Sequence, residues 1–295
     1  MQKGIKFRIY PNKEQQNIIN QTLGCCRLIY NKGLAMRNEA YQNGNKIGYS
    51  QTSAMLTDLK KSDDFAFLKA VDSIALQQSL RDLDRGFVNF FQKRASHPTF
   101  KSKHNHHQSY RIINQGDNIR IVGKYIKLPK LGFVKIRQTM GVEKINNVTI
   151  EHTPTNKYFA VLNVKFEPQP MGNKGGKIGI DVGIKEFYCD SNGNVVYNPK
   201  YLEKSMRKLI REQRKLSRKE KGSTNRNKQR VKVALVHEKI TNQRNDFLQK
   251  QSTMLIRENQ TICIEDLKVK NMMRNHKLAQ HIGSASWSKF FEMLS

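Results

Sequence analysis

KIGIDVGI, residues 177–184, alternates apolar residues with small or acidic ones at the period of a β-strand. Residues two apart in a strand share a face, so Asp181 lies with Gly179 and Gly183, while the isoleucines and Val182 take the other face. Two glycines beside an acid leave room for a metal ion and a phosphate backbone, at a cost in strand stability. The stretch therefore predicts a strand that presents one carboxylate for chemistry.

A second stretch, TICIEDL at 261–267, has the same layout, with Glu265 on the face of Thr261 and Cys263. If the two strands are neighbours in one sheet, the carboxylates of Asp181 and Glu265 can hold divalent metal between them. Oxygen ligands suit Mg²⁺ or Mn²⁺, which keep positions open for water and phosphate oxygens. The alternative is that each acid only caps the next element, because Asp-x-Gly is also common in turns.

The charge of the chain indicates its partners. Its 295 residues contain 53 Lys and Arg against 24 Asp and Glu, a formal net charge of +29. Such a surplus attracts phosphate polyanions, so we expect RNA or DNA as partner before an acidic membrane surface, and no small-molecule substrate. The sequence has no apolar run of about 18 residues and no apolar core near its start, so we expect a cytoplasmic, nucleoid-associated protein without a membrane partner.

The first half of the chain predicts a β-barrel with an inserted helical domain. Short β-prone pieces separated by Gly, Pro and Asn place the barrel at 1–12 and 96–170. Apolar residues at helical spacing place the inserted helical recognition domain at 13–95. Within the barrel, the polar, His-rich stretch 96–117 predicts a loop. Pro, Gly and Lys then predict a linker at 171–176.

The second half, 177–295, predicts an α/β domain with a long basic helical insertion over 199–258. Asn192-Gly193 predicts a two-residue hairpin turn, and Gly222-Ser223 joins two long helices. GSASWSKFFEML at 283–294 predicts the start of a further helix. On the first helix, cations recur opposite the apolar stripe and form a basic ridge that can follow a phosphate backbone. The ridge residues are Arg207, Lys208, Arg211, Arg214, Lys215 and Arg218. The alternative is that these charges are merely solvated.

The cysteines and histidines do not predict a metal site. The four cysteines form no C-x-x-C pair, so we expect small thiols in a reducing compartment and no zinc site in this chain. Three histidines gather within 104–107, where a polar, phosphate-facing loop is the better interpretation than a metal site.

Several stretches together resemble one family. GIDVGIKEF at 179–187 and CIEDLKVKNM at 263–272 resemble the first and second acidic motifs of the RuvC-like, ribonuclease-H-fold nuclease domain of the TnpB family, whose members are also labelled OrfB transposases. YPNKEQQNIINQTLGCCRLIYN, LQQSLRDLDRGFVNFF, HPTFKSK and IKLPKLGFVKIR resemble the same family in the same order. The likeness therefore covers essentially the whole chain, and the motifs together are specific.

The resemblance implies an RNA-guided DNA endonuclease with one RuvC-like site that uses Mg²⁺ or Mn²⁺. It implies that the barrel and its inserted helices hold a guide RNA made from the transposon end and read a short motif beside the target DNA. Asp181 is similar in position to the family's first catalytic Asp, and Glu265 to its Glu. Further candidate contacts to RNA or DNA are Arg27, Tyr30, Asn31 and Lys185. For Tyr30, ordinary helix packing is the alternative.

The likeness stops before the family's zinc ribbon and its third acid, neither of which occurs by Ser295. Two carboxylates give a two-ion site few anionic ligands, so we expect this chain to bind nucleic acid yet cleave poorly. A non-catalytic nucleic-acid-binding regulator or inactive relative is therefore the first alternative. An actin-like or sugar-kinase-like ATPase is the second, although the Gly-rich phosphate loop it requires is missing.

Overall fold

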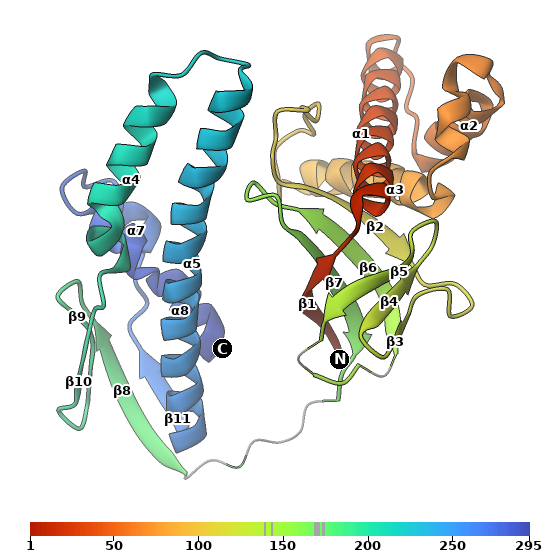
Figure 1. Ribbon diagram of the computed structural model, residues 1–295. Helices are drawn as coiled ribbons and strands as arrows, with labels where there is room; N and C mark the ends of the chain where they lie inside the picture. Colours follow the sequence, from red (N-terminus) through yellow and green to blue (C-terminus); the bar gives the residue numbers. More distant parts are fainter. Residues whose placement is uncertain (139, 143, 168–171, 173–174) are drawn as a thin grey trace. The chain divides into compact units, whose positions relative to one another are not determined.

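A computed structural model describes residues 1–138, 140–142, 144–167, 172 and 175–295. The chain divides into two compact units, Met1–Pro168 and Gln169–Ser295 (Figure 1). Half of the predicted linker, 171–176, lies outside the described residues, namely positions 171, 173 and 174. None of the described helices combines the length and the apolar character needed to cross a membrane.

The first unit contains a curled antiparallel sheet. Its strands are β1 (Gln2–Tyr10), β2 (Gln108–Ile113), β3 (Arg120–Val122), β4 (Tyr125–Leu128), β5 (Gly132–Arg137), β6 (Ile145–His152) and β7 (Tyr158–Lys165). They follow the order β2-β6-β7-β1-β5-β4-β3, with β2 and β3 at the edges. Strand β1 pairs with β7 along most of its length and with β5 near Tyr10, so it lies inside the sheet although it comes first in the chain.

The stretch predicted as a loop, 96–117, contains strand β2, so this prediction was wrong for Gln108–Ile113. Tyr110 and Ile112 are buried in the core while the strand pairs with β6. The histidines and other polar residues before the strand hid these two inward-facing positions, because composition reports the average of a segment and not the alternation within it.

Helices cover this sheet and share its core. They are α1 (Lys13–Gln42), α2 (Tyr49–Lys61), the 3₁₀ helix η1 (Asp63–Lys69) and α3 (Ser73–Phe91). A capping box begins α1, because the Asn12 side chain accepts from the backbone N–H of Gln15 and the Gln15 side chain accepts from that of Asn12. The Asp72 carboxylate caps α3 by accepting the Ala75 N–H at 2.9 Å.

The second unit is a mixed sheet with helices on one face. Its elements are β8 (Gly176–Val182), β9 (Glu186–Asp190), β10 (Val195–Tyr197), α4 (Tyr201–Ser217), α5 (Thr224–Glu258), β11 (Asn259–Ile264), α6 (Val269–Met272), α7 (Ala279–Ala285) and α8 (Trp287–Leu294). The sheet order is β10-β9-β8-β11, with β11 parallel to β8 and the other pairs antiparallel. Ile178 and Ile180 pack with Leu248 and Leu255 of α5 and with Phe290 of α8.

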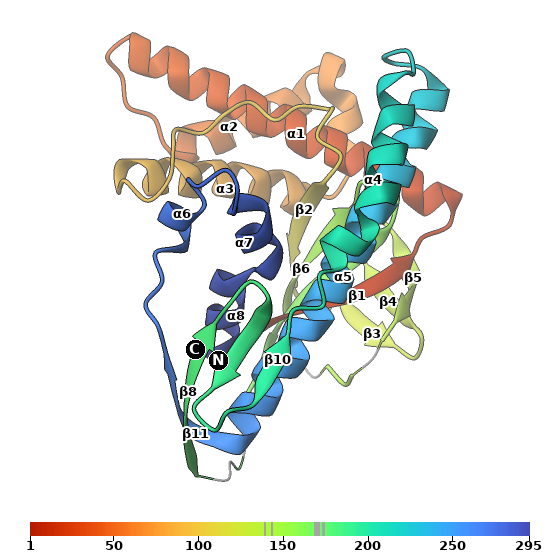
Figure 2. The ribbon, with the colours of Figure 1, turned by 90° about the vertical axis from the view of Figure 1, so that its left-hand side faces the viewer.

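Helices α4 and α5 lie side by side as a hairpin (Figure 2). The prediction that two helices join at Gly222-Ser223 is confirmed: Gly222 has a φ of +89°, and the Ser223 hydroxyl accepts the Arg226 N–H at 3.1 Å. Leu209 and Val236 form part of the apolar seam between the two helices. The basic hairpin is therefore an ordered element with its own small core.

Two details of the second unit differ from the sequence-based prediction. The β9–β10 turn spans four residues, 191–194, in place of two, because the Asp190 carboxylate accepts the backbone N–H groups of Asn192 and Asn194. The single helix expected within GSASWSKFFEML is divided between α7 and α8. The break falls at Ser286, whose φ of +58° interrupts the helix.

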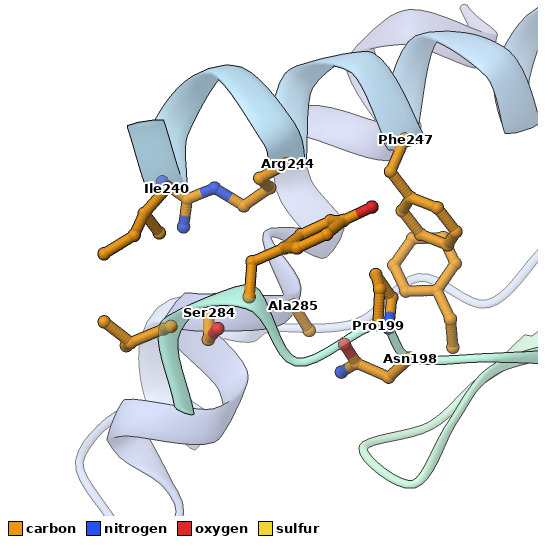
Figure 3. A pocket seen from close by; sticks show the side chains of 10 residues that line it. Asn198, Pro199, Ile240, Arg244, Phe247, Ser284 and Ala285 are labelled. Carbon is orange, nitrogen blue, oxygen red and sulfur yellow. The ribbon is translucent and has the colours of Figure 1, made fainter. Parts of the chain in front are cut away.

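Figure 3 shows where the start of α4 meets α5 and α7. Asn198 and Pro199 face Arg244 and Phe247 of α5 around a crevice of about 10 Å³. The Arg244 guanidinium donates to the Gly283 carbonyl at 3.3 Å. Because this volume holds at most about one water molecule, the crevice is a packing joint that orients the hairpin.

Candidate metal and nucleic-acid site

The two predicted acids lie at the ends of two neighbouring parallel strands, β8 and β11. Ile178 pairs with Ile262 and Ile180 with Ile264, so the two strands are neighbours in one sheet, which is the condition that the metal hypothesis requires. Asp181 and Glu265 each follow this last pair directly, and both are exposed. Adjacent strands lie about 4.8 Å apart, and the carboxyl ends of parallel strands meet at the same edge of a sheet. The fold thus brings the two acids to one edge.

The face that carries Asp181 is polar and open, in contrast to the buried face of the isoleucines. Cys189 of β9 lies directly opposite Asp181. Beside Gly179, the Ser191 hydroxyl accepts the glycine N–H at 3.1 Å. Ile264 departs from the expected pattern, because its side chain belongs to the edge strand β11 and is 38% exposed.

A third carboxylate, Glu186, reaches this face through a β-bulge that the sequence did not indicate. Val196 pairs with Tyr188 whereas Tyr197 pairs with Glu186, so Phe187 is the extra residue of β9. The bulge turns both Phe187 and Tyr188 into the core. Glu186 then falls on the side of Cys189, whose thiol donates to its carboxylate at 3.9 Å.

The electrostatics of Cys189 agree with this placement. Desolvation, followed by the negative charges of Glu186 and Asp181, raises the pKa of the Cys189 thiol. The thiol therefore stays protonated near neutral pH, which makes it a poor metal ligand beside two carboxylates. A hard cation that prefers oxygen ligands suits this face better than zinc does.

The donor set fits a metal ion whose ligands come partly from protein carboxylates and partly from a bound phosphate. In the part of the chain that the structure describes, no grouping of three or more His, Cys, Asp and Glu side chains could hold a metal ion. Magnesium, however, commonly binds through one or two carboxylates together with substrate phosphates and water. Asp181 and Glu265 would supply the protein's part of such a site.

The predicted ridge lies on the exposed side of α4. All six of its cations are exposed: Arg207, Lys208, Arg211, Arg214, Lys215 and Arg218. Between them, Glu212 is buried and accepts from the Gln229 side chain at 2.7 Å, and this hydrogen bond lowers the pKa of the carboxyl. Arg211 and Lys215 approach the same carboxylate at 3.4 and 3.6 Å.

The candidate contacts of the first unit are largely engaged within the protein. Tyr30 is buried, and the Lys101 ammonium lies 4.1 Å from the centre of its ring. The Asn31 amide donates to the Lys101 carbonyl and accepts the Lys101 N–H, which fastens the segment after α3 to α1. Arg27 is partly exposed. Tyr30 and Asn31 therefore have structural roles in this fold.

Lys185, the remaining candidate, lies in the turn between β8, which carries Asp181, and β9. It is exposed, and its ammonium is 3.8 Å from the Glu186 carboxylate. A cation at this position can meet a phosphate that approaches Asp181.

An arginine and amide groove in the first unit escaped the sequence analysis. Its volume is about 630 Å³, and its polar walls come from α3 and from the β2 side of the sheet. The residues that define it are Tyr49, Gln77, Gln78, Arg81, Arg111 and Asn147. The Arg81 guanidinium stacks 4.5 Å from the Tyr49 ring centre, and Arg111 pairs with Asp82. Only the packing of α3 on the sheet unites these residues, so no local motif marked them.

Comparison with known proteins points to one family. Residues 148–276 match the OrfB family of IS605 elements, described as "Probable transposase". A protein of Streptomyces pristinaespiralis named "Putative RNA-guided DNA endonuclease" is 39% identical over 100% of this chain, which covers 74% of that protein. The chain belongs to the OrfB, or TnpB, family.

Other similarities extend across the chain. "Putative RNA-guided DNA endonuclease InsQ" of Escherichia coli K12 is 35% identical over 92% of this OrfB chain and 68% of its own length. Residues 1–46 match a family described as "Helix-turn-helix domain", and here they contain β1 and the single helix α1. A Cas12f1-sgRNA-target DNA complex aligns over 98% of this chain and 87% of that chain, with a TM-score of 0.49 and 12% identity.

Proposed function

We propose that this chain is an RNA-guided DNA endonuclease that hydrolyses phosphodiester bonds at Asp181 and Glu265. The observation that carries the proposal is the parallel pairing of β8 with β11, which ends with both acids at one edge of the sheet. The names of the two relatives that match most of this chain support the reaction class. The open face around Asp181 and Glu265 also leaves room for a long polymer, whereas small substrates are usually enclosed in a pocket.

In this proposal, Asp181 and Glu265 hold Mg²⁺ or Mn²⁺. When bound, such an ion activates water and stabilises charge on the oxygen that leaves the cut strand. Lys185 attracts the phosphate to the exposed face, and the core side of β8, anchored by Ile178 and Ile180, keeps Asp181 in place. The second unit would correspond to the RuvC-like domain of the family.

The first unit and the α4 ridge would hold the nucleic acids. The ridge offers cations along one exposed helix face, which suits a backbone recognised by its charge. The groove offers arginines and side-chain amides such as Gln77 and Asn147, which are the groups that read base edges. We assign the curled sheet and its helices to the wedge-like barrel and recognition parts of the family, and the RNA partner to a transcript of the transposon end.

The direct test supplies the chain with RNA from the transposon end, a matching DNA with its adjacent motif, and Mg²⁺. Slow cleavage is expected, because two carboxylates give a metal ion few anionic ligands. Asp181→Ala or Glu265→Ala should each reduce this rate at least about 100-fold, because metal stabilisation is worth several kcal/mol. Asp58→Ala is the matched control, since this exposed carboxylate lies in the first unit and pairs with Lys61 at 3.2 Å. Equal rates in the control and in the site variants would contradict the assignment.

A second candidate is guided binding without cleavage. It is favoured by the finding that no grouping of three or more His, Cys, Asp and Glu side chains within the described residues could hold a metal ion. Retained RNA and DNA binding with no cutting at any Mg²⁺ or Mn²⁺ concentration would support it. Loss of RNA binding as well would contradict both candidates.

A further inference from the structure

An aromatic cavity in the first unit has no part in the proposed cleavage. It has a volume of about 400 Å³ and lies where the C-terminal parts of α1 and α3 meet the segment after α3. Its defining residues are Arg37, Tyr41, Asp84, Phe87, Phe91 and His97. We call this cavity the aromatic pocket. Its volume falls in the range of pockets that hold small ligands.

The walls of the aromatic pocket are rings fixed against one another. Phe87 and Phe91 stack with their centres 6.2 Å apart and their planes 27° apart. His97 meets Phe87 edge-on at 5.3 Å and Phe90 at 5.1 Å. Despite this order, Phe91 is 71% exposed, as is Tyr41 at 76%. Clustered exposed aromatics on a charged protein mark an interaction site, because each leaves a large apolar face in water.

A buried cation forms the floor. The Arg37 side chain is only 7% exposed, pairs with the Asp84 carboxylate, and places its guanidinium 4.7 Å from the centre of Phe87. Its Nε is buried without a hydrogen-bond partner in the described part of the chain. A buried donor without a partner is costly, so a ligand with an acceptor would relieve it. The pocket thus combines flat apolar walls with an unsatisfied donor.

The charges around the pocket select the ligand. Arg37 balances Asp84, which leaves Lys46 at the rim and Lys93 and Arg94 just beyond α3, all exposed. Aromatic faces, hydrogen-bond donors and flanking cations match a nucleobase with its phosphates. A second copy of this chain would bring a further charge of +29 against the same cations.

We propose that the aromatic pocket binds an unpaired base of a single-stranded nucleic acid, stacked on Phe91 and Tyr41. The base edge would accept a hydrogen bond from Arg37, and the neighbouring phosphates would meet Lys46 and Lys93. Stacking accepts every base, so the site would hold a flipped or unpaired nucleotide with little sequence preference. The proposal concerns binding alone and does not depend on cleavage.

The test measures the fluorescence of 2-aminopurine within short single-stranded RNA and DNA as the 295-residue protein is added. Stacking should quench the fluorescence. The strand type whose 2-aminopurine is quenched, RNA or DNA, identifies which nucleic acid supplies the base. Phe91→Ala and Tyr41→Ala should each weaken binding about 5- to 100-fold without changing its salt dependence, because they remove stacking and no phosphate contact. Phe91→Trp should retain both binding and quenching.

Phe133→Ala is the matched control, since this exposed aromatic of β5 lies outside the pocket. Its affinity should equal that of the unsubstituted protein. Sedimentation velocity tests the alternative that a second copy of this chain occupies the pocket. Unquenched fluorescence with both strand types, or a concentration-dependent dimer that Phe91→Ala dissociates while oligonucleotide affinity stays constant, would overturn the proposal.

Discussion

Gly179 and Gly183 flank Asp181 but have different roles. A Cβ at Gly183 would lie 2.7 Å from the Glu186 carbonyl, so this position needs glycine for the turn into β9. A Cβ at Gly179 would meet only Ser191, at an ordinary 3.7 Å. The fold therefore tolerates a side chain at Gly179. Packing therefore does not require its openness beside Asp181, which in the proposed function leaves room for a ligand.

The two glycines give a matched pair of substitutions. Gly183→Ala should lower the free energy of unfolding by about 1–3 kcal/mol, because the new methyl group must displace backbone. Gly179→Ala should change it by less than about 1 kcal/mol, since alanine is better than glycine in a strand. Urea unfolding of the whole chain measures both. A larger loss for Gly179→Ala would mean that this glycine is structural, which contradicts its assigned role.

The α4–α5 hairpin is a basic element organised around one acid. Glu212 is held between the helices by Gln229, and it faces Arg211 and Lys215. Within the described residues, Arg207 and Arg214 have no ion pair of their own. The six cations of the ridge are thus unequal: two are partly balanced inside the element, and Arg207 and Arg214, seven residues apart on one face, are available to phosphate.

This inequality predicts how RNA binding responds to salt. Replacing Arg207 and Arg214 by Gln should reduce the slope of log affinity against log salt by about 1.4 to 1.8 units, if each cation neutralises one phosphate. Replacing Arg211 and Lys215 removes the same formal charge but should reduce the slope less. These two cations are already partly neutralised by the Glu212 carboxylate, so they contribute less to binding phosphate. Binding isotherms measured at one temperature between about 50 and 300 mM salt give the slopes. An unchanged slope in the first variant would show that the ridge is only solvated.

At the scale of the whole molecule, the sequence predicted what depends on neighbours in the chain. The alternation in KIGIDVGI predicted β8, and the Gly222-Ser223 signal predicted the joint of the hairpin. The sequence could not predict features that arise only when distant segments pack together. The bulge at Phe187 follows from packing in the second core, and the aromatic pocket exists only because α1 and α3 end side by side with His97.

The same reason limits what a motif says about the candidate contacts. Tyr30 and Asn31 belong to a motif shared with the family, but a motif does not distinguish a residue that binds nucleic acid from one that fastens Lys101 to a helix. The net charge of +29 correctly directs attention to polyanions. It does not identify which of the 53 cations contact them.

The most direct measurement of the central claim is Mn²⁺ binding, followed by electron paramagnetic resonance, to the protein with its guide RNA and a target DNA. Asp181→Asn and Glu265→Gln should each weaken one Mn²⁺ site at least about tenfold, and the double variant should add little, because both carboxylates serve the same ion. Asp58→Asn should leave the affinity unchanged. Mn²⁺ affinity that survives both site substitutions, or additive losses from two separate sites, would contradict a shared metal between β8 and β11.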